Sequence, residues 1–250
     1  MRKSLSRIFT LTRRNFKEIL RDPLSLGFLL VMPLVMEIMF YLIFHKMTEQ
    51  FEMKYLAPGI VVFSQAFLTL FAGLLIAMDR ETAFLTRLYV SRAKSFEFIL
   101  GYVFSLVPIA LGQTVLFLLV GGILDPSIFS WRLLAALPLS LLTAALFISL
   151  GILLGSLCSA KAVGGVSSIV VAGQSLLSGM WFPLDGIGKG IITLMNCLPF
   201  RNATTLMQRS VLGIADAFHN FWLPMIIVLA YTTVALVAAI LVFGRKMRSK

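Results

Sequence analysis

The sequence predicts an all-α integral membrane protein with six transmembrane helices. Its 250 residues are 59% hydrophobic and only 13% charged, whereas a soluble domain carries about 25% charged residues. The mean hydropathy is +0.94. Six apolar runs are each about as long as the roughly 20 helical residues that cross a bilayer core. These runs are 24–44, 56–78, 98–120, 133–157, 162–182 and 222–243.

Residues 1–22 precede the first run and predict an amphipathic helix on the membrane surface. Its apolar side chains are Ile8, Leu11, Phe16, Ile19 and Leu20, and its basic ones are Arg7, Arg13, Arg14, Lys17 and Arg21. The alternative is an ordinary basic flank of the first span. This Arg-rich stretch stands where a signal peptide has its apolar region, so we expect no cleaved signal. Asp22 can cap the next helix and Pro23 can begin it.

The remaining residues, 23–250, form a single transmembrane domain whose orientation follows from its charge. With both termini in the cytoplasm, 16 of the 22 Lys and Arg residues fall on the inner side. This bias matches the positive-inside rule. The net charge of +11 is therefore interpreted as a topology signal, and no nucleic-acid partner is expected. We expect a multi-pass protein of the cell (inner or plasma) membrane.

The segment after the fifth span, 183–213, is too short for a domain and too apolar for a free loop. Pro183, Gly186, Gly188 and Gly190 interrupt it, and Pro199 interrupts it again. The stretch GIITLMNCL cannot span a membrane, so a re-entrant or interfacial hairpin on the outer side is predicted.

A charged interruption, DRETAFLTRLYVSRAKSFE at 79–97, separates the second and third spans on the cytoplasmic side. If it is helical, Phe84, Leu85, Leu88 and Tyr89 form an apolar stripe. The acids Asp79 and Glu81 would stand at the start of that helix, where its dipole favours them. The stripe needs a partner, either lipid headgroups or another protein. The charges that flank the stripe closely favour a protein.

This segment resembles the cytoplasmic connection between the second and third spans of ABC type-2 exporter permeases. The matching residues are Asp79, Arg80, Glu81, Leu85, Arg87, Leu88, Val90 and Ser91, although Arg92 stands where the family often has Pro. The Arg-Asp-Pro corner and Pro33 are similar to that family's first span. Its outer region is matched by Ser178, Gly179, Phe182, Pro183 and Leu184, and then by Leu198, Pro199, Phe200, Arg209, Leu212 and Gly213. Leu198-Pro199 and Arg201-Asn202 depart from the family's usual Asn-Pro and Thr-Tyr.

The resemblance implies that 79–97 is a coupling helix docked on a separate ABC-type ATPase. The residues it assigns to ATPase coupling are Asp79, Arg80, Glu81, Phe84, Leu85, Arg87, Leu88 and Tyr89. It also implies two ATPase copies and a second permease copy, as a homodimer or as a heterodimer with a close relative. No cofactor is expected in this chain, because ATP and Mg would be bound by the ATPase.

Residues within the spans are candidates for the translocation path or the subunit interface, namely Glu37, Gln65, Phe67, Phe71, Gln174, Leu177 and Met180. Glu37 is a mid-span acid, which faces a bundle interior or a wet cavity, or else is a protonated or hydrogen-bonded structural residue. Pro33, one turn earlier, can free a backbone carbonyl. The glutamines also suit interhelical hydrogen bonds, and the apolar side chains suit lipid contact or packing. Gly179, Phe182, Pro183 and Pro199 are expected in an outer lid.

No motif predicts catalysis or metal binding by this chain. GIGKG at 186–190 has Pro183 where a P-loop needs its first Gly and Gly190 where it needs Ser or Thr. The only histidines, His45 and His219, lie near span ends, and Cys158 and Cys197 have no metal or redox spacing. A membrane-embedded enzyme is therefore poorly supported.

The function expected is that of the permease subunit of an ATP-driven ABC exporter. Few intramembrane charges and many Phe and Met residues favour a hydrophobic or amphipathic cargo, drug-like or lipid-like. Two alternatives stay open: a polysaccharide or glycolipid exporter permease, and a channel or carrier that works without an ATPase.

Overall fold

The computed structural model describes residues 2–81, 95–182, 184, 186–213 and 218–248, and these residues form helices and connections without a strand. The α-helices are α1 (Arg2–Leu20), α2 (Pro23–Phe44), α3 (Met53–Glu81), α5 (Ser95–Leu124), α6 (Leu133–Leu157), α7 (Ala160–Leu177), α8 (Lys189–Cys197), α9 (Pro199–Leu212) and α10 (Leu223–Arg248). Two short 3₁₀ turns, η1 (Glu49–Phe51) and η2 (Pro126–Ile128), and a π-helical turn, η3 (Phe218–Trp222), complete the described chain.

Six of these helices are long and apolar enough to cross a membrane, which confirms the predicted number of spans. The segments are Leu26–Phe44, Met53–Glu81, Ser95–Leu124, Leu133–Leu157, Ala160–Leu177 and His219–Arg245. The fifth ends five residues earlier than predicted because Gly179 takes a positive φ of 71°, which breaks a helix. The second and third are longer than predicted and include charged residues at their ends.

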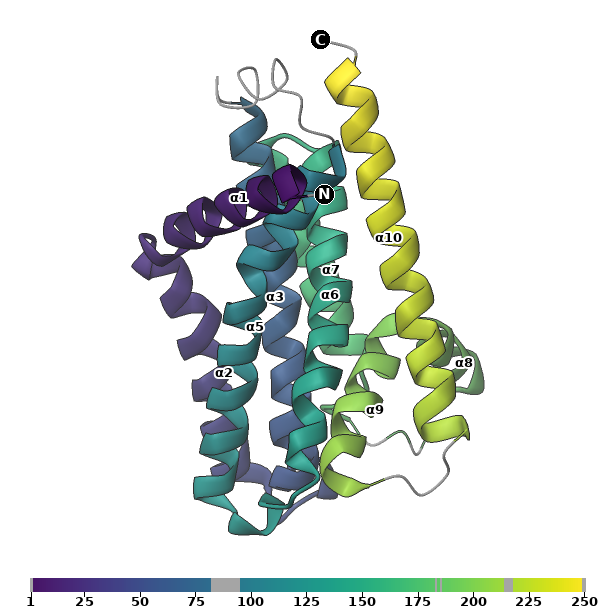
Figure 1. Cartoon of the computed structure of the whole chain (residues 1–250). Coiled ribbons are helices and arrows are strands. Elements are labelled where there is room, and N and C mark those ends of the chain that lie inside the picture. The colour runs from purple at the N-terminus through teal and green to yellow at the C-terminus, as the bar shows by residue number, and fades with distance from the viewer. Residues whose placement is uncertain (1, 82–94, 183, 185, 214–217, 249–250) are drawn as a thin grey trace.

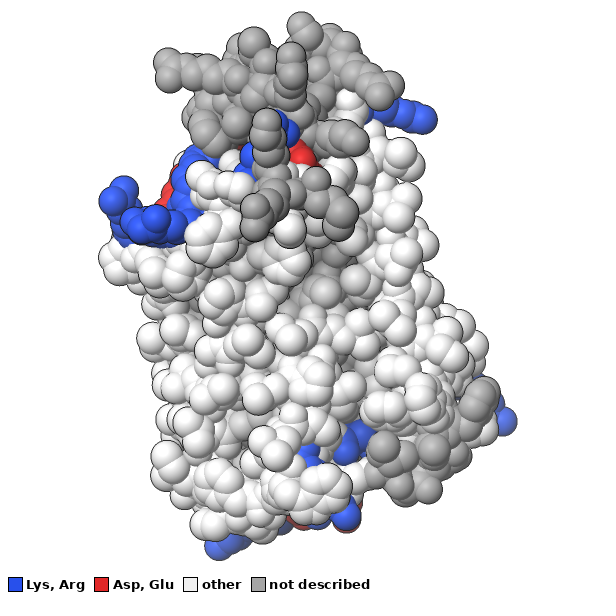
Figure 2. All heavy atoms as spheres, in the orientation of Figure 1, with Lys and Arg blue, Asp and Glu red and all other residues white. Residues whose placement is uncertain are grey.

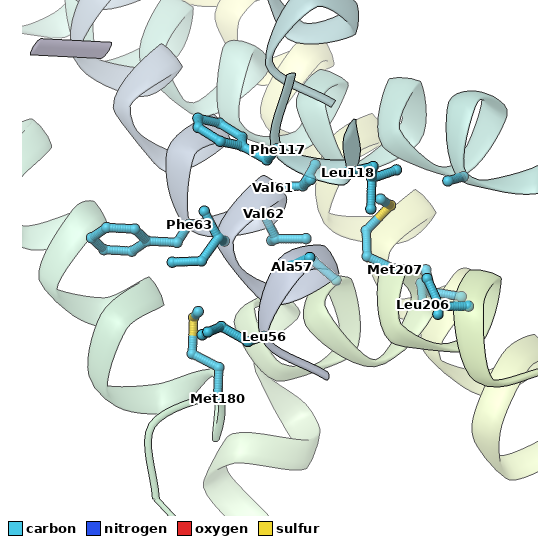
Figure 3. Close-up of a cluster of buried hydrophobic side chains, with 14 of the residues drawn as sticks. Leu56, Ala57, Val61, Val62, Phe63, Phe117, Leu118, Met180, Leu206 and Met207 are labelled. Atoms are coloured by element: carbon cyan, nitrogen blue, oxygen red, sulfur yellow. The ribbon is translucent and has the colours of Figure 1, made fainter. Parts of the chain in front are cut away.

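The helix α3 is the centre of the bundle, and α2, α5, α6, α7 and α9 all pack against it. It contributes Leu56, Ala57, Val61, Val62 and Phe63 to the core cluster of Figure 3, in which α5 supplies Phe117 and Leu118. Met180 reaches this cluster from beyond the end of α7, and Leu206 and Met207 reach it from α9.

Close backbone contact joins α3 to α6. A β-carbon added to Gly155 would lie 2.3 Å from the carbonyl oxygen of Gly73, and one added to Gly151 would lie 2.3 Å from that of Thr69. Both distances are impossible for real atoms, so only glycine fits at these two positions. The small-residue pattern of α6 is thus a helix-packing site.

The surface helix is confirmed as a helix: α1 lies across one end of the bundle, at a steep angle to the spans (Figure 1). The end of α10 lies at this same end, called here the α1 end. Figure 2 shows Lys and Arg gathered over the α1 end and again at the opposite end, with a wide band of uncharged side chains between them. This band includes many exposed large apolar residues, as a surface facing lipid requires.

The segment after the fifth span forms two helices, α8 and α9, in the half of the molecule far from α1 (Figure 1). Pro199 is buried at the start of α9, and α9 packs against α3, α6 and α10. The two helices have the lengths that a hairpin needs, and their depth in the membrane stays a prediction.

Candidate coupling site at the α1 end

The last turn of α3 is tied to α1 and α5 through Asp79, which is almost fully buried. Arg14 of α1 donates from its two terminal nitrogens to the two carboxylate oxygens, at 2.8 and 2.6 Å. The Tyr102 hydroxyl of α5 donates to Oδ2 at 2.6 Å. Bidentate contacts between an arginine and a carboxylate are stronger and more directional than single neutral hydrogen bonds.

Arg14 keeps its charge in this contact. Partial burial lowers the pKa of the guanidinium, but the hydrogen bond and the charge of Asp79 outweigh this, so the pKa is raised. When folding raises the pKa of a base, the protonated base stabilises the fold at every pH below its ordinary pKa. This stabilisation is lost only as the pH rises through the raised pKa. The Arg14 side of the contact is therefore insensitive to pH throughout the neutral range.

Arg80 and Glu81, the next two residues, close the ends of two other helices. The Nη1 atom of Arg80 donates to the carbonyls of Gly155 and Ser156 at 2.6 and 2.7 Å, where α6 ends. Glu81 accepts the backbone N–H of Ala160 at 2.9 Å, where α7 begins. The charge of each side chain matches the helix dipole, since cations are stabilising near a helix C-terminus and anions near a helix N-terminus. Ser159, the cap residue of α7, makes no side-chain cap bond of its own, so Glu81 supplies one.

The helix α1 also holds the first turns of α5. Glu97 is almost fully buried and accepts from Ser4 and from Arg7, whose Nη1 lies 3.3 Å from Oε2. One turn on, a β-carbon added to Gly101 would lie 2.8 Å from Cβ of Leu11, so the two helices touch there.

These contacts lie on either side of segment 82–94 in the sequence. Asp79 lies just before it and Glu97 just after it, and both are held by α1. The predicted coupling residues Phe84, Leu85, Arg87, Leu88 and Tyr89 lie outside the described residues. The described flanks alone connect both ends of this segment to α1, α3, α5, α6 and α7.

One prediction about this region is wrong. Asp79 and Glu81 do not begin a helix, because both lie within α3, which the structure describes through Glu81. Both acids have partners within the bundle: Asp79 accepts from Arg14 and Tyr102, and Glu81 accepts from the N–H of Ala160. These partners lie 65, 23 and 79 residues away along the chain, so no local pattern indicates them.

Comparison with known protein families agrees with this arrangement. The sequence model of the family described as "ABC-2 type transporter" matches residues 6–212. The chain belongs to the ABC-2 type transporter family. The comparison with curated proteins gave no match. The chain is thus a multi-pass permease subunit of an ABC transporter, in a family that normally pairs with an ABC ATPase and whose members are generally not catalytic themselves.

Within the spans of this ABC-2 permease, the glutamines join helices. Gln65 donates to the Ser140 carbonyl at 3.2 Å and accepts from Thr143 at 2.6 Å, which links α3 to α6. Gln174 donates to Thr204 at 2.9 Å, which links α7 to α9. Both side chains are buried. Gln65 and Gln174 therefore make interhelical hydrogen bonds, which is the alternative role that the sequence allowed for the glutamines.

Gln113 has a similar role, made possible by Pro33. A proline has no N–H, so the carbonyl of Leu29, four residues earlier, loses its helical donor. Gln113 Nε2 donates to that carbonyl at 3.4 Å and to the Ser64 carbonyl at 3.2 Å. The carbonyl freed by Pro33 thereby joins α2 to α5.

The candidate apolar residues of the permease lie in different surroundings among the described residues. Phe67 and Phe71 are half-buried on α3, and Phe71 lines a cavity of about 220 Å³ with Glu18, Ile19 and Asp22 of the α1–α2 corner. Leu177 is half-buried at the end of α7. Met180 is buried in the core instead, where its side chain packs on Gly59.

The residues predicted for an outer lid lie at the far end of the bundle. Gly179 takes its positive φ beside Leu184 and Met195, Phe182 is exposed, and Pro199 begins α9. Pro183 lies outside the described residues. Their role as a lid stays a prediction.

Glu37, the mid-span acid, is completely buried between α2, α3 and α5. Its carboxyl group lies against Gly121 rather than on the outer surface of the chain.

The residues that sequence reasoning missed at the α1 end are Ser4, Tyr102 and Glu97. Glu97 carried the only usable signal, as an acid beside an apolar run.

Proposed function

We propose that this chain is the permease subunit of an ATP-driven exporter, and that an ABC-type ATPase docks at its α1 end, on the cytoplasmic side. The observation that supports this is the attachment of both flanks of segment 82–94 to α1, through Arg14–Asp79 and Arg7–Glu97. A force applied to that segment would reach α1, α3, α5, α6 and α7 through hydrogen bonds that involve charged side chains.

The coupling would work as a rigid connection. Asp79, Arg80 and Glu81 join the end of α3 to α1, α6 and α7, and α3 is the helix against which most of the bundle packs. A partner that pulls on 82–94 when it binds nucleotide therefore moves α3 and its neighbours together. Two permease copies and two ATPase copies would build the working transporter.

The proposed cargo is hydrophobic or amphipathic, drug-like or lipid-like. Most of the described ionisable side chains of the spans lie at the bundle ends, where Asp79 and Glu97, for example, accept hydrogen bonds. Segment 183–213, with α8 and α9, is proposed to close the outer side of the path.

Replacement of both Leu85 and Leu88 by Asp tests the docking step. The double variant should insert in the membrane and keep its thermal stability in detergent, yet lose the ATPase that co-purifies with the tagged wild-type protein. Asp substitutions at Leu134 and Ile123, both strongly exposed at the opposite end, are the matched control and should keep the ATPase. Equal ATPase recovery from both double variants would contradict the proposal.

A further inference from the structure

Glu37 occupies an apolar site with walls from three other elements. A β-carbon added to Gly121 of α5 would lie 3.3 Å from Oε1 of Glu37, 2.7 Å from Cβ of Ala57 on α3, and 3.1 Å from Cδ1 of Ile128 in η2. Because Gly121 has no side chain, α5 approaches Ala57 of α3 closely, and the Glu37 carboxyl lies against the α5 backbone.

Neither oxygen of this carboxyl has a hydrogen-bond partner among the described residues. The other acids buried in the described bundle, Asp79 and Glu97, each accept bonds from an arginine and a hydroxyl. An ionised carboxylate without such partners is very costly to bury, and the group takes up a proton instead. The surroundings of Glu37 therefore select the neutral acid.

The titratable groups on the surrounding elements do not neutralise Glu37. Tyr41 donates to the Leu124 carbonyl, and a ring nitrogen of His45 lies 2.6 Å from the Tyr41 carbonyl. Lys54 pairs with Glu52 at 2.6 Å, and Asp125 accepts from the Ser127 N–H. Glu49 of η1 and Tyr55 of α3 make no hydrogen bond to Glu37 either. A proton is thus the cation that this site holds.

Release of that proton needs movement of α2. This helix has few buried residues, whereas most of α3 is buried, so α2 is the more easily displaced of the two. Separation of α2 from Gly121 and Ala57 would open the carboxyl to water.

We propose that Glu37 is a proton-binding site of this permease, occupied while α2 packs on α3 and α5 and emptied when α2 moves away from α5. The proposal goes beyond ATPase docking and requires only this chain. A failed test here would leave the docking proposal intact, because Glu37 lies within the spans and makes none of the contacts at the α1 end.

The first test is reaction of the full-length protein in lipid vesicles with dicyclohexylcarbodiimide. The acid O–H adds across one C=N bond of the reagent: oxygen binds the central carbon, the proton goes to nitrogen, and nothing leaves. Glu37 should be labelled at neutral pH at least about tenfold more than Glu97, since one unit of proton affinity is a tenfold effect. Glu97 is the matched control, equally buried but ion-paired. Stronger labelling of Glu97 would overturn the proposal.

The second test does not depend on access of the reagent. The infrared spectrum of the wild-type protein at neutral pH should show a C=O band of a protonated carboxylic acid that Glu37→Gln lacks. The amide is neutral and nearly the same shape, so this variant should fold. In D₂O the band should shift slowly, because α2 must open first. Identical spectra would show an ionised Glu37, and an immediate shift would show a carboxyl already open to water; either result would overturn the proposal.

Discussion

At the residue scale, the α1 end is organised by three consecutive charges, each matched to a different partner. Asp79 binds the cation Arg14, Arg80 binds the carbonyl end of α6, and Glu81 binds the N–H end of α7. The sequence identified all three residues as important because the family motif contains them. It could not identify their partners, because a carboxylate can pair with any of seven basic residues in 1–22.

The Arg14–Asp79 pair is expected to fix α1 to the bundle. Asp79→Asn removes a nearly buried carboxylate from Arg14 and Tyr102, and should lower the free energy of unfolding by about 1–3 kcal/mol. Glu18→Gln removes a second, exposed partner of the same arginine and should cost less than about 0.5 kcal/mol. Thermal unfolding in detergent compares the two. A larger loss in Glu18→Gln would contradict the assigned partners.

At the element scale, the six spans were predictable because their apolar runs are long, but their ends were not. The apolar run of the second span stops at residue 78, whereas α3 continues through Glu81, where contacts with α1, α6 and α7 hold its charged residues. The fifth run continues to 182, whereas α7 ends at Leu177 before the positive φ of Gly179. Helix ends in this protein follow from tertiary contacts and backbone geometry, which hydropathy does not report.

The contact of α3 with α6 makes a sharper prediction, because α6 and α7 offer a matched pair of glycines. Gly155→Ala would place a β-carbon 2.3 Å from the Gly73 carbonyl oxygen, so the helices must separate, at a cost of about 1–3 kcal/mol. Gly164→Ala on α7 meets no described atom within 4 Å and should gain up to about 1 kcal/mol from helix propensity. Equal thermal stabilities of the two variants would contradict the close contact.

At the scale of the whole molecule, the two native cysteines provide a test of orientation. Cys158 follows α6 at the α1 end, and Cys197 is exposed at the end of α8 in the opposite half. If the α1 end is cytoplasmic, a membrane-impermeant thiol reagent should label Cys197 in intact cells, and Cys158 only after permeabilisation. Cys197→Ser should abolish the labelling of intact cells. Labelling of Cys158 alone from outside would show the reverse orientation.

The central proposal, that segment 82–94 is where an ATPase docks, is tested most directly by photo-cross-linking in native cells. A photoreactive amino acid placed at Tyr89 should capture a protein that mass spectrometry identifies by its P-loop sequence. The same amino acid at Trp131, which is highly exposed at the far end, should capture none. Capture at Tyr89 alone would support the ATPase-driven permease. Cross-links from Tyr89 only to lipid or to this chain itself would contradict it.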